Sequence, residues 1–151
     1  MTPRSPAMSP EDCDRYLRVL GVPRREPGHE ALTELTAAHL THVPFENVSK
    51  LYHLRRSGFR GIPTLPQFLE GIERHRLGGT CYANNHHLNR LLEFLGYDAA
   101  LCAADMSQPD VHLVNRVRLE GRDYLVDAGY GAPFLAPVPL DLDHDHEIAL
   151  G

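Results

Sequence analysis

The stretch at residues 77–96 constrains the fold most, because a glycine-rich loop runs directly into a helical pattern. The stretch opens with the sequence Leu77-Gly78-Gly79-Thr80-Cys81-Tyr82-Ala83-Asn84-Asn85. Apolar residues then recur at the spacing of one helix face, at Leu88, Leu91, Leu92 and Leu95. Gly96 is typical of the position that follows the last helical turn. The pattern predicts a helix that begins at Cys81 or within one turn of it.

A cysteine in this position is a candidate nucleophile. The first turn of a helix has unpaired N–H groups and the positive end of the helix dipole, and both favour a thiolate over a thiol. The same N–H groups can stabilise the oxyanion that forms when a thiolate attacks an acyl group. A base that takes the thiol proton must then come from elsewhere in the chain.

A β-hairpin pattern supplies a base and a carboxylate. Residues 111–119 alternate with period two, Glu120-Gly121 is a turn dipeptide, and residues 123–127 read as the returning strand. With a two-residue loop, His112 becomes the diagonal neighbour of Asp127 on one face of the sheet. Such neighbours have Cα atoms about 7–8 Å apart, which these two side chains can span.

Cys81, His112 and Asp127 therefore form a candidate catalytic triad. The imidazole would take the thiol proton, and the carboxylate would hold the imidazole in one tautomer and stabilise its charged form. Spacing alone leaves another interpretation open. It consists of a packed thiol, a structural histidine and a turn-capping aspartate.

The other segments read as capped helices, one strand and loops. Helices are predicted for about 10–20, 30–40 and 64–75, and a short apolar strand for 99–104. Residues 50–63 hold a basic cluster and several glycines and prolines. For them we expect a solvated loop or short hairpin rather than an anion site; the cluster consists of Lys50, Arg55, Arg56 and Arg60.

Composition excludes several classes of protein. A chain of 151 residues is expected to form one domain, and its net charge of −5 argues against nucleic acid as a partner. No apolar run reaches membrane-spanning length and the N-terminus does not read as a signal peptide, so no membrane partner is expected. The cysteines are few and far apart, which predicts free thiols and a cytoplasmic location. Cys13 and Cys102 are expected to be inert buried thiols.

Four blocks of the sequence resemble the arylamine N-acetyltransferase family. The family motif Arg-Gly-Gly-x-Cys-x-Glu-x-Asn corresponds to residues 77–85, and the blocks keep the family's order across most of residues 13–140. The other three blocks are Pro44-Phe45-Glu46-Asn47, His112-Leu113-Val114-Asn115 and Asp127-Ala128-Gly129-Tyr130-Gly131. Four blocks in order are far more specific than one.

The resemblance implies acyl transfer by a ping-pong mechanism. Cys81 would take an acetyl group from acetyl-CoA as a thioester, and an arylamine, hydrazine or hydroxylamine nitrogen would then attack it. Acetyl-CoA would be the acyl-donor substrate, and no metal is implied. The aromatic residues at matched positions would line the acceptor pocket, with plain core packing as the alternative; they are Phe45, Tyr130 and Phe134.

The resemblance also implies an α+β fold. A helical bundle at 1–96 would hold the nucleophilic cysteine, and an incomplete antiparallel sheet or partial β-barrel at 97–151 would hold the histidine and aspartate. Such a core is similar to those of papain and transglutaminase. The sequence ends at Gly151, before the C-terminal lid of the family. A fragment, a frame-shifted product and a naturally short homologue are all compatible with this end, and the oligomeric state is undetermined.

Two positions depart from the family motif, since Leu77 replaces its arginine and Ala83 its glutamate. Glu46 would then lack its partner unless Arg74 or Arg76 replaces it. These departures keep two alternatives open. One is a hydrolase or amide synthase that uses the same triad on another acyl donor, and the other is an inactive, truncated homologue. The histidine pairs His86-His87 and His144/His146 lack the spacing of a structural zinc site.

Overall fold

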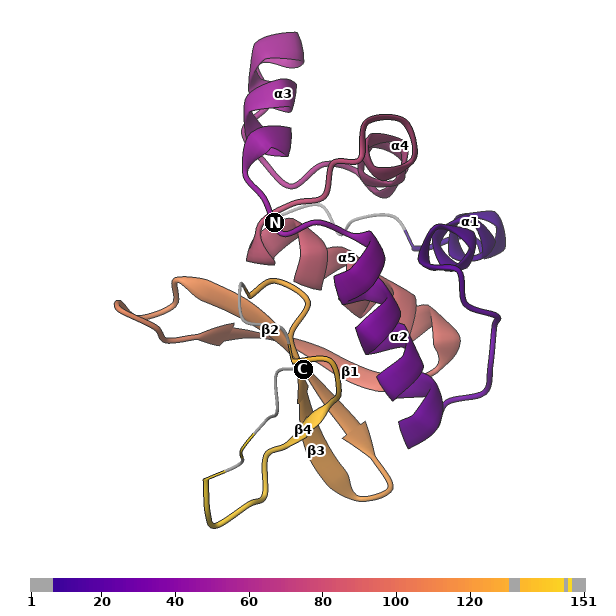
Figure 1. Ribbon diagram of the computed structural model, residues 1–151, viewed down its shortest axis with the longest axis vertical. Coiled ribbons are helices and arrows are strands. Elements are labelled where there is room, and N and C mark those ends of the chain that lie inside the picture. The colour runs from indigo at the N-terminus through magenta and orange to yellow at the C-terminus, as the bar shows by residue number, and fades with distance from the viewer. Residues whose placement is uncertain (1–6, 131–133, 146, 148–151) are drawn as a thin grey trace.

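The computed structural model describes residues 7–130, 134–145 and 147. In these parts of the chain, five helices precede one four-stranded sheet (Figure 1). The helices are α1 (Pro10–Leu20), α2 (His29–His42), α3 (Val48–Ser57), α4 (Leu65–His75) and α5 (Cys81–Leu95). The strands are β1 (Asp98–Ala104), β2 (His112–Leu119), β3 (Arg122–Val126) and β4 (Val138–Pro139). This order of helices before strands confirms the α+β class.

Local signals set the ends of the helices. The Oγ of Ser9 accepts a hydrogen bond from the N–H of Asp12 at 3.1 Å, Pro10 occupies the first turn, and Gly21 ends α1 in the left-handed conformation. At α4, the Oε1 of Gln67 accepts a hydrogen bond from the N–H of Thr64 at 3.0 Å. The helices predicted at 10–20, 30–40, 64–75 and from Cys81 onward are therefore confirmed, with shifts of a few residues.

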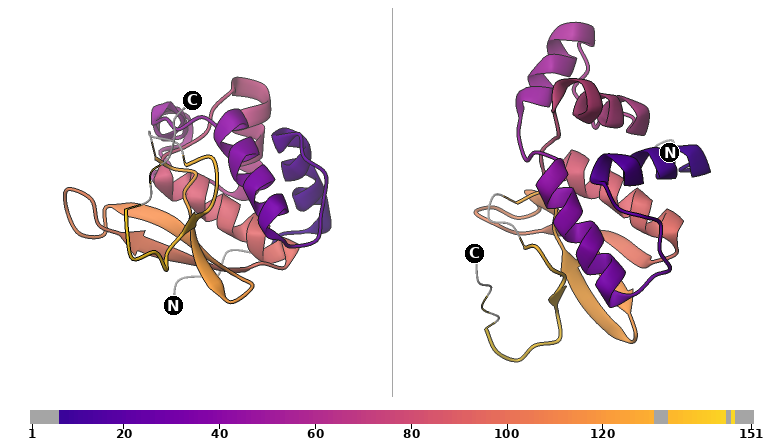
Figure 2. Two further views of the ribbon diagram at one scale, coloured as in Figure 1. Left: turned by 60° about the horizontal axis from the view of Figure 1, so that its bottom comes forward. Right: turned by 45° about the vertical axis from the view of Figure 1, so that its right-hand side comes forward.

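The prediction for residues 50–63 is wrong in its first half, because α3 occupies Val48–Ser57. The helix start is stabilised by Glu46, whose Oε2 accepts a hydrogen bond from the N–H of Ser49 at 2.8 Å. Gly58 ends the helix with φ +69°. Ser49 is the only α3 residue that is buried, so the helix has no continuous apolar face against the core. The sequence of α3 therefore lacks the apolar periodicity that predicts a helix. In the structure, α3 projects outward beyond α1, α2 and α5 (Figure 2).

The sheet is antiparallel in the order β1-β2-β3-β4. Leu119 pairs with Arg122, as predicted, and the two loop residues Glu120 and Gly121 both have positive φ, at 51° and 81°. Two positive φ values in a two-residue loop match the right-handed twist of the strands. The returning strand ends at Val126, so Asp127 lies directly beyond it and can point away from the ladder.

One hydrophobic cluster joins the helices to the sheet. It includes Leu88, Leu91 and Leu92 of α5, each with 0% exposure, together with Val117 and Val126 of the sheet. The division at residues 96 and 97 into two subdomains stays a prediction. Cys13 is fully buried, as expected, and burial raises the pKa of its thiol. Cys102 is only half-buried, which corrects the expectation for that residue because it lies on the outer strand of the sheet.

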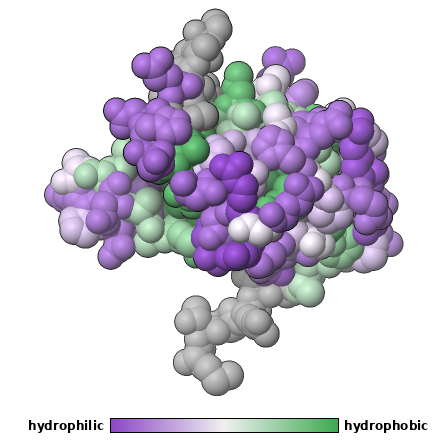
Figure 3. Space-filling model, turned by 90° about the horizontal axis from the view of Figure 1, so that it is seen from below, coloured by the Kyte–Doolittle hydropathy of each residue, from purple (hydrophilic) through white to green (hydrophobic). Residues whose placement is uncertain are grey.

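The surface seen from below is mainly hydrophilic, with small hydrophobic areas between the polar side chains (Figure 3). This agrees with the many charged residues of the sequence. None of the helices in the described part of the chain has the length and hydrophobicity needed to span a bilayer.

Gly78 is required by a close backbone approach. A Cβ at this residue would lie 2.0 Å from the carbonyl oxygen of Pro44, and the same oxygen accepts hydrogen bonds from the N–H of Gly79 at 3.2 Å and the Nδ2 of Asn84 at 3.2 Å. The 44–46 segment is thereby held against the loop that leads into α5.

We expect the substitution Gly78→Ala to lower the free energy of unfolding by about 2–3 kcal/mol, because the methyl group forces the two backbones apart and weakens these hydrogen bonds. Urea unfolding measures the change. Gly28→Ala is the matched control, since a Cβ at Gly28 meets nothing within 4 Å. Equal unfolding midpoints for the two variants would contradict the prediction.

Candidate active site

Cys81 is the first residue of α5 and is buried, with 9% exposure. Thr80 precedes it in an extended conformation, with φ −82° and ψ −179°. The cysteine therefore lies at the helix start, as the sequence predicted, where the N–H groups of the first turn have no partner within the helix.

His112 and Asp127 are joined by a short hydrogen bond. The distance between Nε2 of the imidazole and Oδ2 of the carboxylate is 2.6 Å, and both residues are buried. An ionised carboxylate only accepts hydrogen bonds, so Nε2 carries the proton and Nδ1 has a free lone pair. Nδ1 forms no hydrogen bond with any described residue. The pairing expected from the hairpin register is therefore present.

The loop that follows β3 packs against the start of α5. A Cβ at Gly129 would lie 2.3 Å from the Cα and 2.8 Å from the Cβ of Cys81. Only a glycine fits this contact. The segment that begins with Asp127 is thus held directly beside the cysteine.

Asn85 holds Asp127 and the backbone next to His112 in place, and the sequence indicated no such role for it. It lies one helical turn after Cys81 and is fully buried. Its Nδ2 donates to Oδ1 of Asp127 at 2.8 Å and to the carbonyl oxygen of Leu113 at 2.6 Å. Its Oδ1 accepts from the N–H of Ala128 at 2.9 Å. The signal for this residue was its i+4 spacing from Cys81, which places both on one face of a helix.

We expect Asn85→Ala to slow alkylation of Cys81 by iodoacetamide at neutral pH about 10- to 100-fold, by analogy with lost supporting hydrogen bonds at other sites. The reason is that Asp127 and, through it, His112 lose a fixed orientation. Peptide mapping after timed alkylation measures the rate. The control is Asn89→Ala, because Asn89 is also buried on α5 but its Nδ2 has no partner in the described structure. An equal rate in both variants would contradict the prediction.

The three aromatic residues expected to bind substrate do not come together as a group. Tyr130 and Phe134 stack with ring centroids 6.0 Å apart, and the Tyr130 ring lies 5.9 Å from that of His112. Both line an open cavity of about 470 Å³ that His112 and Asp127 also border. Phe45 is 50% exposed and does not line this cavity. It does not line a second cavity either, which lies between α3 and the start of α5. Gly131 lies outside the described residues.

The structure shows the partners that Glu46 has in place of the arginine of the family motif. Glu46 pairs with neither Arg74 nor Arg76 and instead accepts hydrogen bonds from the backbone N–H groups of Gly78 at 2.9 Å and Ser49 at 2.8 Å. Arg74 forms an ion pair with Glu70 at 3.2 Å. Two backbone donors compensate the carboxylate without a cation.

Within the described parts of the chain, no three His, Cys, Asp or Glu residues are arranged to hold a metal ion. Nε2 of His87 donates a hydrogen bond to the carbonyl oxygen of Pro63, and the imidazole stacks on Phe68 in the interior. Nδ1 of His144 lies 2.9 Å from Oδ1 of Asp143. His146 lies outside the described residues.

Comparisons with known proteins agree with this fold. A model of the N-acetyltransferase family matches residues 29–149. The arylamine N-acetyltransferase pineal gland isozyme NAT-3 of Gallus gallus is 33% identical, over 78% of this chain and 41% of that protein. The N-malonyltransferase FDB2 of Fusarium pseudograminearum is 29% identical, over 94% of this chain and 50% of that protein. The arylamine N-acetyltransferase from Salmonella typhimurium has a similar structure, with a TM-score of 0.74 and 25% identity over 94% of this chain and 53% of that one.

The chain therefore belongs to the arylamine N-acetyltransferase family. It spans about half the length of the relatives that it matches.

Proposed function

We propose that this protein transfers an acetyl group from acetyl-CoA to the nitrogen of an arylamine, hydrazine or hydroxylamine. Family membership supports acetyl transfer. The observation that carries the proposal is the hydrogen bond of 2.6 Å between His112 and Asp127, because Asp127 begins the loop that packs against Cys81 through Gly129. Cys81, His112 and Asp127 are the proposed catalytic residues. The acceptor pocket would include Tyr130 and Phe134.

In the first half-reaction, Nδ1 of His112 takes the proton of the Cys81 thiol. The thiolate attacks the carbonyl carbon of the acetyl thioester, and N–H groups at the start of α5 stabilise the tetrahedral oxyanion. The C–S bond to coenzyme A breaks, and the imidazolium returns its proton to the leaving thiolate. Asp127 stabilises the imidazolium throughout and stays ionised.

In the second half-reaction, the amine nitrogen attacks the Cys81 thioester. His112 takes a proton from the nitrogen, the C–S bond breaks, and an N-acetylated amine leaves. The free enzyme is regenerated, so the two substrates react in turn and never need to be bound together. The substrates would be small molecules, and we place this chemistry in the cytoplasm.

The test is to incubate the protein with acetyl-CoA and to follow its intact mass. We expect the mass of one acetyl group to appear on Cys81 with stoichiometric release of coenzyme A, and to disappear when an arylamine such as 4-aminobenzoate is added. The variant Cys81→Ala is the control, because an acetyl adduct that persists in it would lie on another thiol, such as the half-buried Cys102. Absence of both the adduct and coenzyme A release would exclude the proposal for this chain.

A second candidate is transfer from a different acyl donor, or hydrolysis of one, by the same three residues. It is favoured by the two changed motif positions Leu77 and Ala83, and by the resemblance to a relative named as an N-malonyltransferase. Malonyl-CoA and other acyl thioesters, tested in the same mass assay, separate the candidates. Turnover of one of these without an acetyl adduct from acetyl-CoA would favour the second.

A further inference from the structure

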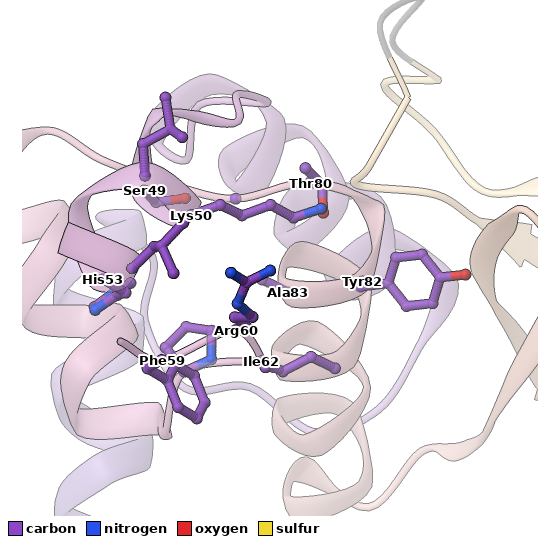
Figure 4. A pocket seen from close by; sticks show the side chains of 14 residues that line it. Ser49, Lys50, His53, Phe59, Arg60, Ile62, Thr80, Tyr82 and Ala83 are labelled. Carbon is purple, nitrogen blue, oxygen red and sulfur yellow. The ribbon is translucent and has the colours of Figure 1, made fainter. Parts of the chain in front are cut away.

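A cavity of about 410 Å³ lies between α3, residues 59–63 and the start of α5 (Figure 4). This volume falls in the range of small-molecule sites. Thr80, Tyr82 and Ala83 contribute to its wall, whereas Cys81, His112 and Asp127 do not line it. The proposed acyl transfer makes no use of this cavity.

The cavity has an apolar wall that other parts of the described chain leave uncovered. Leu51 is 53% exposed, Phe59 39% and Ile62 37%. Contiguous exposed apolar surface in a folded domain often marks a binding site. Since α3 contributes no residue to the core cluster, its apolar side chains have no interior to fill.

Two cations complete the lining. Lys50 and Arg60 both border the cavity, and neither forms an ion pair with another described residue. In Figure 4 the Lys50 side chain runs toward Thr80, and the guanidinium of Arg60 points into the middle of the cavity. No aspartate or glutamate is among the lining residues.

A buried hydroxyl lies in the same wall. The Oγ1 of Thr80 is inaccessible to solvent and has no hydrogen-bond partner in the described structure. Because this oxygen is sealed from solvent, a ligand in the cavity does not reach it as the wall stands, and the hydroxyl is not a ligand contact. Glu46 precedes the start of α3, and its carboxylate accepts hydrogen bonds from two backbone N–H groups.

The basic cluster that the sequence showed is therefore divided by the fold. Lys50 and Arg60 line the cavity, but Arg55 and Arg56 do not. Arg56 instead donates to the hydroxyl of Tyr52 at 3.1 Å and lies over its ring. Ala83 lies in the wall at the position where the family motif has a glutamate, so no carboxylate there neutralises the two cations.

We propose that this cavity binds a small amphipathic anion. The ligand would have a flat or branched apolar body and one carboxylate. The apolar body would pack against Phe59 and Ile62, and the carboxylate would accept hydrogen bonds from Lys50 and Arg60. A solvated loop or short hairpin was expected at residues 50–63; α3 corrects the conformation, and the proposal takes up the alternative of an anion site.

The proposal is tested by binding alone, so its outcome does not depend on acyl transfer. The probe is 2-naphthoate, which has an apolar body, one carboxylate and no amine, and the neutral comparison is 2-naphthamide. Isothermal titration calorimetry is expected to show saturable binding of one naphthoate per chain, and binding of the amide at least about tenfold weaker. Equal affinity for the two probes, or no saturable binding of naphthoate, would overturn the proposal.

Two variants locate the binding site. In the double variant Lys50→Gln/Arg60→Gln the affinity for naphthoate is expected to fall at least about tenfold. Arg55→Gln is the control, since it removes a positive charge from α3, the helix that carries Lys50, at a residue outside the cavity, and it should change the affinity less than about twofold. An unchanged affinity in the double variant would place naphthoate elsewhere, for example beside Tyr130 and Phe134, and would overturn the proposal.

A salt series tests the proposal on the unmodified protein, so the result does not depend on whether a variant folds. The affinity for naphthoate should fall as NaCl rises from about 0.05 to about 0.5 M, because added ions screen partly exposed charges. The affinity for naphthamide should stay constant or rise. A naphthoate affinity that does not fall with salt would overturn the proposal.

Discussion

Replacing Asp127 by asparagine is expected to slow acylation of Cys81 by about three to four orders of magnitude, as the same change does in other triads. Oδ1 of Asp127 accepts hydrogen bonds from Nδ2 of Asn85 at 2.8 Å and from the N–H of Gly129 at 2.9 Å. An asparagine that keeps these two bonds must direct its NH₂ group at Nε2 of His112. Nε2 then becomes an acceptor, so the proton moves to Nδ1.

An imidazole protonated at Nδ1 cannot take the thiol proton, and the base is lost while the packing is kept. The acylation rate is measured by intact mass after mixing with acetyl-CoA. Alkylation of Cys81 by iodoacetamide at neutral pH, which needs no particular acyl donor, should slow in the same direction. Asp98→Asn, an exposed change on β1, is the control. A loss smaller than tenfold in Asp127→Asn would show that the carboxylate does not set the tautomer of His112.

The second large effect concerns stability at low pH and arises from two buried histidines. Burial lowers the pKa of His39 to about 3, and burial together with the nearby His86 lowers the pKa of His87 to about 3. His39 contacts the hydroxyl of Tyr16 at 2.8 Å, and Nε2 of His87 lies 3.0 Å from the carbonyl oxygen of Pro63. Both side chains are held neutral in the folded protein.

The direction of the stability change with pH follows from a comparison of proton binding in the folded and unfolded chains. Between pH 6.5 and 3 the unfolded chain binds protons at these histidines and the folded chain does not, so stability is complete above pH 6.5 and is lost as the pH falls. Each histidine contributes at most about 1.4 kcal/mol per pH unit. We expect the free energy of unfolding to be on the order of 4 kcal/mol lower at pH 5 than at pH 7.5 from these two groups.

Urea unfolding at the two pH values measures this loss. In the variant His87→Gln the loss should shrink by about half, because one of the two titrating groups is gone. His42→Gln is the control, since His42 is exposed at the end of α2. A loss of equal size in His87→Gln and in the unmodified protein would contradict the assignment of this effect to buried histidines.

Local sequence was sufficient wherever neighbouring residues decide the structure. Ser9, Pro10 and Gly21 predicted the ends of α1, because capping involves atoms only a few residues apart. Glu120 and Gly121 predicted the hairpin register, since a two-residue loop allows one pairing of its strands. That register alone was enough to bring His112 to Asp127.

Contacts between distant segments were beyond such reasoning. The helix at Val48–Ser57 is a separate case, because its cap by Glu46 is local but its residues lack the continuous apolar face that predicts a helix. An arginine was the partner expected for Glu46, but the close approach of two backbones supplies the N–H of Gly78 as a donor instead. The i+4 spacing places Asn85 on the same helix face as Cys81, but which atoms of β2 and of the loop after β3 lie beside that face is decided by packing between distant segments.

The sequence by itself therefore determined the helix that begins at Cys81, the hairpin with its histidine and aspartate, and the family resemblance, because short-range sterics and hydrogen bonding specify each of these. Only the tertiary structure decided how they meet. Gly129 packs on Cys81, and Asn85 forms its buried hydrogen bonds, across 28 to 48 positions of the sequence. The fold also decides that Lys50 and Arg60 line the cavity whereas the other basic residues of the cluster do not. Close packing sets these distances, and it is a property of the folded chain as a whole.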